Sequence, residues 1–110
     1  MPEPKATMKK IDLRPYSLPR GGKYDIIGSF KELLFHPEQK LTVPESFENM
    51  ELLKKLEGIA SDYILVDSGE YRRIMRAYSA MTAPGPDDME FFRRIRDAEE
   101  VPVKEVPHKR

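Results

Sequence analysis

The two histidines of this chain are the first residues to consider for acid–base chemistry or metal binding. His36 directly precedes Pro37 at the end of a predicted helix, where an imidazole can bind the free carbonyl groups. His108 lies among charged residues close to the end of the chain. Neither has a histidine or carboxylate partner at the spacing that zinc sites use. Because the chain also contains no cysteine, thiolate metal sites and cysteine nucleophiles are excluded, and we expect neither a metal nor a cofactor.

The carboxylates, serines and glycines show no catalytic pattern. Acidic residues gather at the predicted helix starts, where the helix dipole favours negative charge. Ser68 lacks the flanking glycines of a nucleophile elbow, and Gly21–Gly22 lacks the continuation of a phosphate-binding loop. We therefore expect no enzyme activity; the alternative is an enzyme whose site one sequence does not reveal. The acidic residues at helix starts are Asp67, Glu70, Asp87, Asp88 and Glu90.

Arginine is distributed unevenly. Six of the nine arginines fall on the polar sides of the third and fourth predicted helices. If these helices form a hairpin around residues 84–86, both groups share one face, and guanidinium forks suit phosphate or carboxylate groups. The favoured alternative is a solvated face paired with the acidic residues above. An acidic protein partner is the next interpretation and nucleic acid the third. The candidate interaction residues are Arg72, Arg73, Arg76, Arg93, Arg94 and Arg96.

Four helices are predicted to position these residues. The first spans residues 25–35, with Asp25 as N-cap and an end before the proline at 37. The second begins after Thr42, which forms a capping box with Glu45. The third is capped by Ser68, and the fourth spans residues 87–98. Their expected core stripes are Ile26, Ile27, Phe30, Leu33 and Leu34; Phe47, Met50, Leu53 and Leu56; Tyr71, Ile74, Met75, Tyr78 and Met81; and Met89, Phe92 and Ile95, with Phe91 at the margin.

Two short strands are predicted, one within residues 8–13 and one at residues 63–66. The expected fold class is therefore α+β with helices dominant. Residues 8–100 are expected to form one domain. Residues 1–7 are expected to be a disordered arm and residues 101–110 an extended tail.

Apolar residues on these irregular segments suggest docking. Tyr16 and Leu18 lie in a proline- and glycine-rich connection, and flexible segments that carry apolar groups often become ordered on a partner. The valines of the tail are predicted either to add an edge strand or to dock on a partner as an extended segment. These valines are Val101, Val103 and Val106.

Size and composition agree with one small domain. The 110 residues include 19 basic and 19 acidic side chains, so the formal net charge is zero and a dedicated nucleic-acid binder is not indicated. Hydrophobic residues make up 39% and charged residues 35%, which is polar for an isolated domain, so a partner or self-association is expected. The longest apolar run is too short to span a bilayer, and the N-terminal residues lack a signal-peptide core. A cytoplasmic protein without membrane contact is therefore expected.

Three segments resemble a class of small uncharacterised tailed-phage and prophage proteins. They are residues 24–37 (YDIIGSFKELLFHP), 64–74 (ILVDSGEYRRI) and 88–101 (DMEFFRRIRDAEEV). The resemblance covers roughly residues 8–103 and contains no catalytic motif. It implies a virion-assembly, structural or host-modulating protein, in the virion or the host cytoplasm.

These observations favour a non-enzymatic protein, of phage virion or assembly type, that acts by protein–protein docking and forms homo-oligomers. The alternative is a small regulator that binds nucleic acid or a host protein through the arginine-rich helical face.

Overall fold

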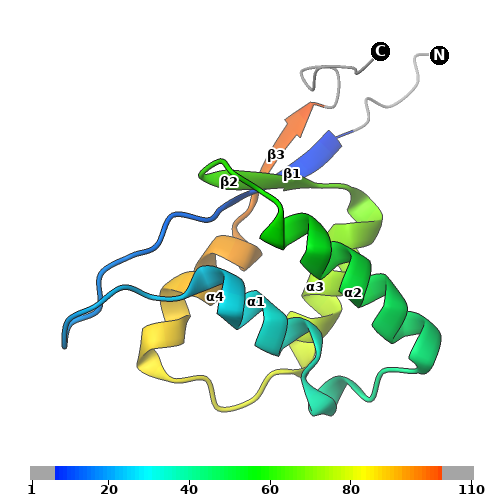
Figure 1. Ribbon diagram of the computed structural model, residues 1–110, viewed down its shortest axis with the longest axis horizontal. Coiled ribbons are helices and arrows are strands. Elements are labelled where there is room, and N and C mark those ends of the chain that lie inside the picture. Colours follow the sequence, from blue (N-terminus) through cyan, green and yellow to red (C-terminus); the bar gives the residue numbers. More distant parts are fainter. Residues whose placement is uncertain (1–6, 103–110) are drawn as a thin grey trace.

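Three short antiparallel strands form one sheet, and the helices pack against one of its faces (Figure 1). The computed structural model describes residues 7–102. The strands are β1 (Thr7–Asp12), β2 (Tyr63–Val66) and β3 (Glu99–Pro102), in the order β2-β1-β3. The helices are α1 (Ile26–Leu34), α2 (Val43–Glu57), α3 (Ser68–Ala80) and α4 (Met89–Arg96), with 3₁₀ turns at Pro37–Gln39 and Pro86–Asp88. The prediction of a helix-dominated α+β fold is confirmed.

A third strand joins the two that were predicted, as the edge-strand alternative for the tail valines allowed. The third strand includes Val101 and Pro102, which were expected to belong to an extended tail, and Thr7 belongs to β1 rather than to the N-terminal arm. A four-residue segment that begins with two glutamates carries little strand signal by itself. It forms a strand because it follows the end of α4, where the chain lies beside β1 (Figure 1). The rest of the predicted arm and tail lies outside the described residues.

The strand register separates the sheet into a core face and an outer face. On the core face Ile11 lies opposite Ile64, and both are buried. Because side chains alternate along a strand, Lys10 and its cross-strand neighbours Leu65 and Glu99 lie on the outer face, where none of them is buried.

Local capping explains where the helices begin. The Asp25 side chain accepts from the Gly28 amide at 3.0 Å, and the predicted Thr42–Glu45 capping box is present. For α3 the prediction was wrong by one residue, because Asp67 and not Ser68 is the N-cap. The Asp67 carboxylate accepts from the Glu70 amide at 2.8 Å, and the Glu70 carboxylate accepts from the Asp67 amide at 2.9 Å.

The C-terminal end of α1 is satisfied by amide side chains rather than by His36. The buried Gln39 side chain donates to the carbonyls of Leu33 and Leu34, and buried Asn49 of α2 donates to the carbonyl of Leu34 at 2.8 Å. The His36 Nδ1 instead accepts from the Glu38 amide at 3.2 Å and so caps the following turn. The expectation that the imidazole binds the helix carbonyls was therefore wrong.

The core confirms the predicted faces of α1 and α3 but corrects those of α2, described below, and α4. Met89, expected to be buried, is 54% exposed, whereas Phe91, placed at the margin, is 2% exposed. The helix is only eight residues long and follows a 3₁₀ turn, so its orientation is set by the packing of Phe91 edge-on against Phe30 at 4.9 Å. Other core residues with almost no exposed surface are Leu33, Leu34, Leu52, Leu56, Val66, Ile74, Ala77 and Ile95.

The connection between β1 and α1 is anchored to the domain, contrary to the prediction for Tyr16 and Leu18. Both are half-buried against the core. Tyr16 stacks on Tyr24 with ring centres 4.7 Å apart. Its hydroxyl donates to the Asp87 carbonyl at 2.7 Å and accepts from the Phe91 amide at 3.2 Å. These contacts join the connection to the start of α4, although the two are far apart in the sequence.

Candidate docking surfaces

The arginines of α3 have three different environments. Arg72 is exposed, and Arg76 is exposed but forms an ion pair with Glu45 of α2. Arg73 is half-buried, and its Nε has no hydrogen-bond partner among the described residues. Of these three, only Arg72 is exposed and forms no ion pair with a described residue.

The arginines of α4 are paired with nearby carboxylates. Arg93 and Arg94 both bind the Glu90 carboxylate, at 2.6 Å and 2.9 Å, and Arg96 binds Asp97 through two hydrogen bonds of 2.9 Å. Hydrogen bonds from Arg93 and then Arg94 lower the pKa of Glu90 to about 2. This agrees with the favoured interpretation of a self-paired charged face, although Glu90 is the only one of the predicted acidic partners that pairs with these six arginines.

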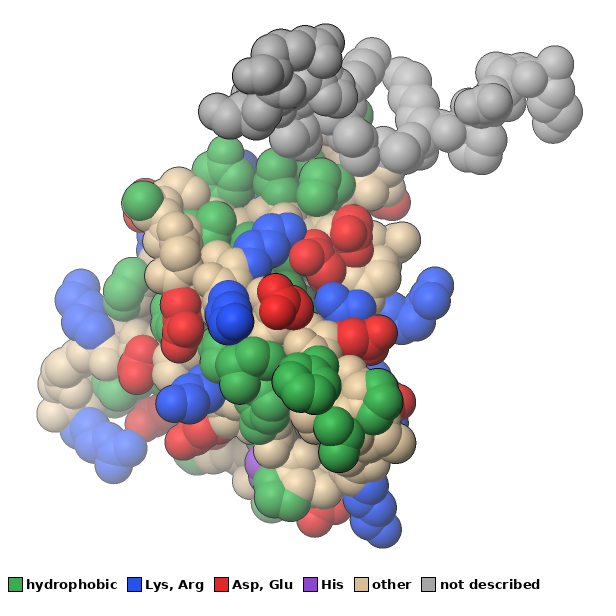
Figure 2. All heavy atoms as spheres, turned by 45° about the vertical axis from the view of Figure 1, so that its right-hand side comes forward, with side chains coloured by type: hydrophobic (Ala, Val, Ile, Leu, Met, Phe, Trp, Pro, Cys, Tyr) green, Lys and Arg blue, Asp and Glu red, His purple; other side chains and the backbone are tan. Residues whose placement is uncertain are grey.

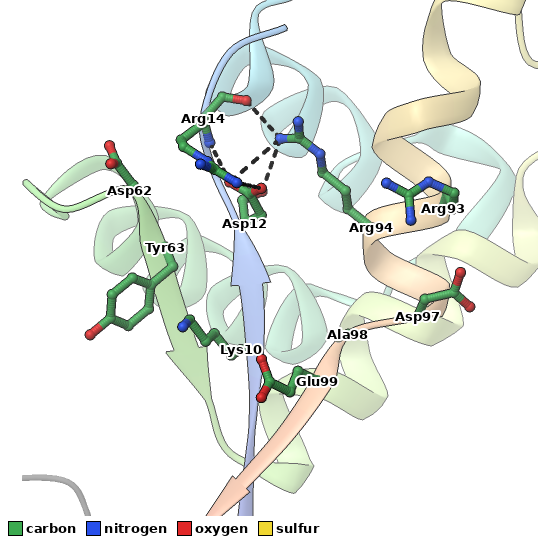
Figure 3. A pocket seen from close by; sticks show the side chains of 10 residues that line it. All are labelled: Lys10, Asp12, Arg14, Asp62, Tyr63, Arg93, Arg94, Asp97, Ala98 and Glu99. Carbon is green, nitrogen blue, oxygen red and sulfur yellow. Dashed lines mark hydrogen bonds and ion pairs between the residues drawn. The ribbon is translucent and has the colours of Figure 1, made fainter.

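Arg94 has a structural role. Its side chain is only 11% exposed, and its Nη1 donates to the carbonyl of Arg14 at 2.6 Å and to that of Asp12 at 3.3 Å. Figure 3 shows the Arg94 guanidinium pointing from α4 to the end of β1, beside Asp12 and Arg14. A guanidinium held this way is not available to an external phosphate.

A shallow hollow of about 480 Å³, the charged cleft, opens beside Arg94 (Figure 3). Four of its lining residues are cationic and four are acidic, and several pair with one another, as Arg14 does with Asp12 at 2.8 Å. The hydrogen bond from Arg14 is the main cause that lowers the pKa of Asp12 to about 2. The mixture of signs produces no concentrated field for a phosphate ligand. The charged residues are Lys10, Arg14, Arg93 and Arg94, and Asp12, Asp62, Asp97 and Glu99.

The two arginine groups line different hollows. Arg72 lines a hollow together with Lys9 and Glu100, whereas Arg93 and Arg94 line the charged cleft with Lys10 and Glu99. Neighbouring residues of a strand point to opposite faces, so these hollows lie on opposite faces of the sheet. The starts and ends of α3 and α4 pack antiparallel, as the contacts of Tyr71 with Ile95 and of Tyr78 with Phe92 show, yet Arg72 and the two α4 arginines line separate hollows.

The predicted tail valines are only partly within the described structure. Val101 is a half-buried strand residue opposite Met8 on the outer face of the sheet. It therefore fulfils the edge-strand alternative of the prediction. Val103 and Val106 lie outside the described residues.

An apolar surface on α2 is exposed, although Phe47 and Met50, two of its residues, were expected in the core. Val43 is 70% exposed, Phe47 is 69% exposed and Met50 is 41% exposed. We call these three residues the outer stripe; they recur at intervals of four and three residues on the side of α2 opposite Leu52 and Leu56. In Figure 2, apolar side chains gather in the lower half of the face shown, below a band of charged side chains.

The outer stripe adjoins a hollow of about 910 Å³ between α1 and α2, the apolar groove. Met50 belongs to both surfaces. The groove has apolar walls of Phe35, Leu53 and Met81, while Lys31 and Glu32 from α1 also line it. The sequence contains a signal for this region. The helix α2 has more apolar positions than one buried face can hold, so some of them must be exposed.

A smaller hollow of about 190 Å³ brings His36 near two acids, Glu32 and Asp88. Its size is below that of ordinary small-molecule pockets, roughly 300–1,000 Å³. Both Asp88 oxygens are engaged, one by the Tyr24 hydroxyl at 2.6 Å and the other by the Gly85 amide at 3.0 Å. Within the described residues His36 forms no hydrogen bond to either acid, and its Nδ1 accepts from the Glu38 amide. The hydrogen bonds of Asp88 hold the Tyr24 ring and the turn at Gly85 in place.

Comparisons with known proteins give no relative from which a function could be transferred. No protein-family model, curated protein or solved structure matches the chain. Within residues 7–102, no group of three or more histidine and carboxylate side chains is placed to hold a metal ion. No helix in that range has the length and apolar character needed to cross a membrane. The surfaces themselves are therefore the basis for a functional proposal.

Proposed function

We propose that this protein is a non-catalytic binding protein whose outer stripe and apolar groove dock an amphipathic helix of another protein. The observation that carries the proposal is the exposure of Val43 and Phe47 on a helix whose opposite face already fills the core. Burying an apolar side chain of this size is worth roughly 1.5–3 kcal/mol. A partner that covers the outer stripe therefore gains binding energy without any rearrangement of the domain.

The spacing of the stripe indicates a helical partner. Positions 43, 47 and 50 form the i, i+4, i+7 row that packs against the grooves of a second helix. The apolar groove beside this row can receive the partner's own apolar side chains, because its walls are Phe35, Leu53 and Met81. An extended peptide would not match this row of contacts.

The charge beside the stripe specifies the polar flank of the partner. Glu51 is exposed on α2 beside the stripe, on the side away from the apolar groove, and it forms no ion pair with any residue in the described range. A partner helix with lysine or arginine along that flank would place an opposite charge against this carboxylate. We therefore expect a basic amphipathic helix.

This proposal includes the phage setting implied by the resemblance, since virion assembly depends on such docking. The alternative regulator that binds nucleic acid through its arginines has less support, because four of the six arginines are paired with carboxylates (Arg76, Arg93, Arg94 and Arg96). Phosphate contacts would have to displace these pairs.

The proposal can be tested with two designed amphipathic peptides that share one apolar stripe and differ in flank, one rich in lysine and one in glutamate. Titrating each into the isotope-labelled protein should show the lysine peptide binding more tightly, with amide shifts at Val43, Phe47 and Met50. Phe47→Asp should weaken this binding at least about tenfold, which corresponds to about 1.4 kcal/mol. Met89→Asp is the matched control, since Met89 is also exposed but lies at the start of α4.

Equal binding of both peptides would contradict the basic partner. Shifts that avoid α2, or binding unaffected by Phe47→Asp, would contradict the docking surface itself. A natural partner recovered by cross-linking supports the proposal only if its purified form shows the same dependence on Phe47.

A further inference from the structure

The two edges of the sheet differ in their capacity to accept another strand. The outer edge of β3 contains Pro102, which has no amide hydrogen, and carries Glu99 and Glu100. Proline and charge are the usual means by which proteins block strand addition. The outer edge of β2 contains Tyr63, Ile64, Leu65 and Val66, with neither proline nor charge. Figure 3 shows β2 as the outermost strand on its side of β1.

The register identifies which backbone groups face outward from β2. The Leu13 amide donates to the Asp62 carbonyl at 2.7 Å, so Leu13 and Asp62 form a hydrogen-bonded pair. Such pairs alternate with non-hydrogen-bonded pairs along antiparallel strands. Ile64 and Val66 therefore bond to β1, whereas the amide and carbonyl groups of Tyr63 and Leu65 point away from it.

These outward groups are almost entirely free within the described structure. No described backbone group pairs with the amide or carbonyl of Leu65 or with the amide of Tyr63. The Tyr63 carbonyl accepts only from the Ser61 hydroxyl at 2.9 Å, and a carbonyl oxygen has a second lone pair. The edge thus offers two donors and two acceptors in the spacing of a strand.

We propose that β2 pairs antiparallel with β2 of a second copy of this chain, about a two-fold axis at Ile64, to form a continuous six-stranded sheet. In this register Tyr63 of each copy lies opposite Leu65 of the other, and all four outward groups form hydrogen bonds. A two-fold interface requires a self-complementary edge, and a register centred on Ile64 provides it. This pairing is independent of the proposed helix docking on α2.

The side chains agree with this register. On the outer face, each Leu65 would lie between Lys10 of its own copy and the Tyr63 ring of the other, and aromatic–aliphatic pairs stabilise antiparallel strands. The Lys10 amine already lies 4.6 Å from the centre of its own Tyr63 ring. No acid is placed opposite an acid, because Asp62 faces Val66 and Asp67 faces Ser61 of the other copy. A charged β2 edge would have prevented such pairing, whereas this edge permits it.

The test is the mass of the full chain in solution as its concentration rises. An interface built on one short strand belongs to the small, weak class, so sedimentation velocity should cover about 10 µM to about 1 mM. The apparent mass should rise from 12.8 kDa toward twice that value. Isotope-filtered NMR on mixed labelled and unlabelled protein should show contacts between the Tyr63 ring of one copy and the Leu65 methyl groups of the other.

Leu65→Pro removes the outward amide without breaking a hydrogen bond to β1 and should abolish the concentration dependence. Glu100→Pro is the matched control, because it makes the same change on the outer edge of β3 and should leave self-association intact. If circular dichroism shows that Leu65→Pro does not fold, Tyr63→Lys is the second variant. A lysine there faces Asp12 within the monomer and places a charge on the edge of β2. Because it also removes the contact of Lys10 with the ring, its fold is checked by the same measurement.

A mass that stays at 12.8 kDa across the range would overturn the proposal. So would self-association that persists in folded variants with a blocked β2 edge. The protein could also stay monomeric, with the Leu65 amide protected from hydrogen exchange only after an extended peptide is added. The β2 edge would then bind a different chain, and self-pairing would be overturned.

Discussion

The guanidinium of Arg94 lies over the ring of Tyr16, 5.0 Å from its centre. The same group donates to the Arg14 carbonyl and binds Glu90, so α4 is attached to the connection that leads from β1 to α1. Residues that are distant in the sequence are thereby held together by one nearly buried cation. Arg94, one of the candidate interaction residues, joins parts of its own domain.

Replacing Arg94 by alanine should destabilise the domain more than the replacement of an exposed arginine usually does. Hydrogen bonds to charged groups contribute roughly 1.5–3 kcal/mol each, and Arg94 makes several while its side chain is only 11% exposed. We expect a loss of about 2–4 kcal/mol in the free energy of unfolding, measured by urea denaturation. Arg93→Ala is the control and should change it far less, because Arg93 is 53% exposed and exposed ion pairs contribute little to stability. Equal effects of the two variants would contradict the structural role of Arg94.

Acid should destabilise the protein through carboxylates held by arginine. The pKa of Asp12 is lowered from 3.8 to about 2, first by the Arg14 hydrogen bond, and that of Glu90 from 4.5 to about 2. A pKa lowered by folding stabilises the native state above the unfolded-state pKa, and this contribution is lost as the pH falls toward the folded-state pKa. We therefore expect the melting temperature to fall between about pH 4.5 and about pH 2.

Asp12→Asn checks the source of this acid sensitivity. The variant should be less stable than the wild type at neutral pH, and its melting temperature should fall less steeply over the acid range. Asp62→Asn is a suitable control, since Asp62 is exposed and forms no ion pair with the described residues. If Asp12→Asn and the wild type show the same slope, the ion pairs at the end of β1 are not responsible.

Truncating side chains to alanine should distinguish the buried side of α2 from its exposed side by the loss in the free energy of unfolding. Leu53 is 4% exposed and Ile74 is 0% exposed, so Leu53→Ala and Ile74→Ala should each cost roughly 2–5 kcal/mol. Phe47→Ala, on the outer stripe, should change the free energy of unfolding by less than about 0.5 kcal/mol. Urea denaturation of the three variants measures these values. A large loss for Phe47→Ala would show that the outer stripe packs within the domain.

The contribution of the polar contact between α1 and α2 to the stability of the domain should also be measurable. Asn49 is 2% exposed and donates to the Leu34 carbonyl, which it shares with Gln39. Asn49→Leu removes this donor from the buried end of α1 and should cost roughly 1–3 kcal/mol. Glu48→Gln, at the neighbouring exposed position, should be nearly neutral. Unchanged melting of Asn49→Leu would mean that Gln39 alone satisfies the helix end.

The sequence by itself determined the parts of the structure that depend on neighbouring residues. The proline at 37 and the Thr42–Glu45 capping box were sufficient to locate the end of α1 and the start of α2, because capping and proline sterics act within one turn. The run at residues 63–66 identified β2, and the spacing around Ile74 identified the buried side of α3. The helix-dominated α+β class followed from these elements.

The tertiary structure decided everything that depends on which elements meet. It turned Glu99–Pro102 into a strand, buried Phe91 while exposing Met89, and placed the outer stripe in solvent. Periodicity shows that a helix has an apolar side, but only the packing of α1 and α3 selects which of two apolar sides of α2 is covered. Arg94 makes the same point, since the carbonyls and ring that bind it come from residues that adjoin α4 only after folding.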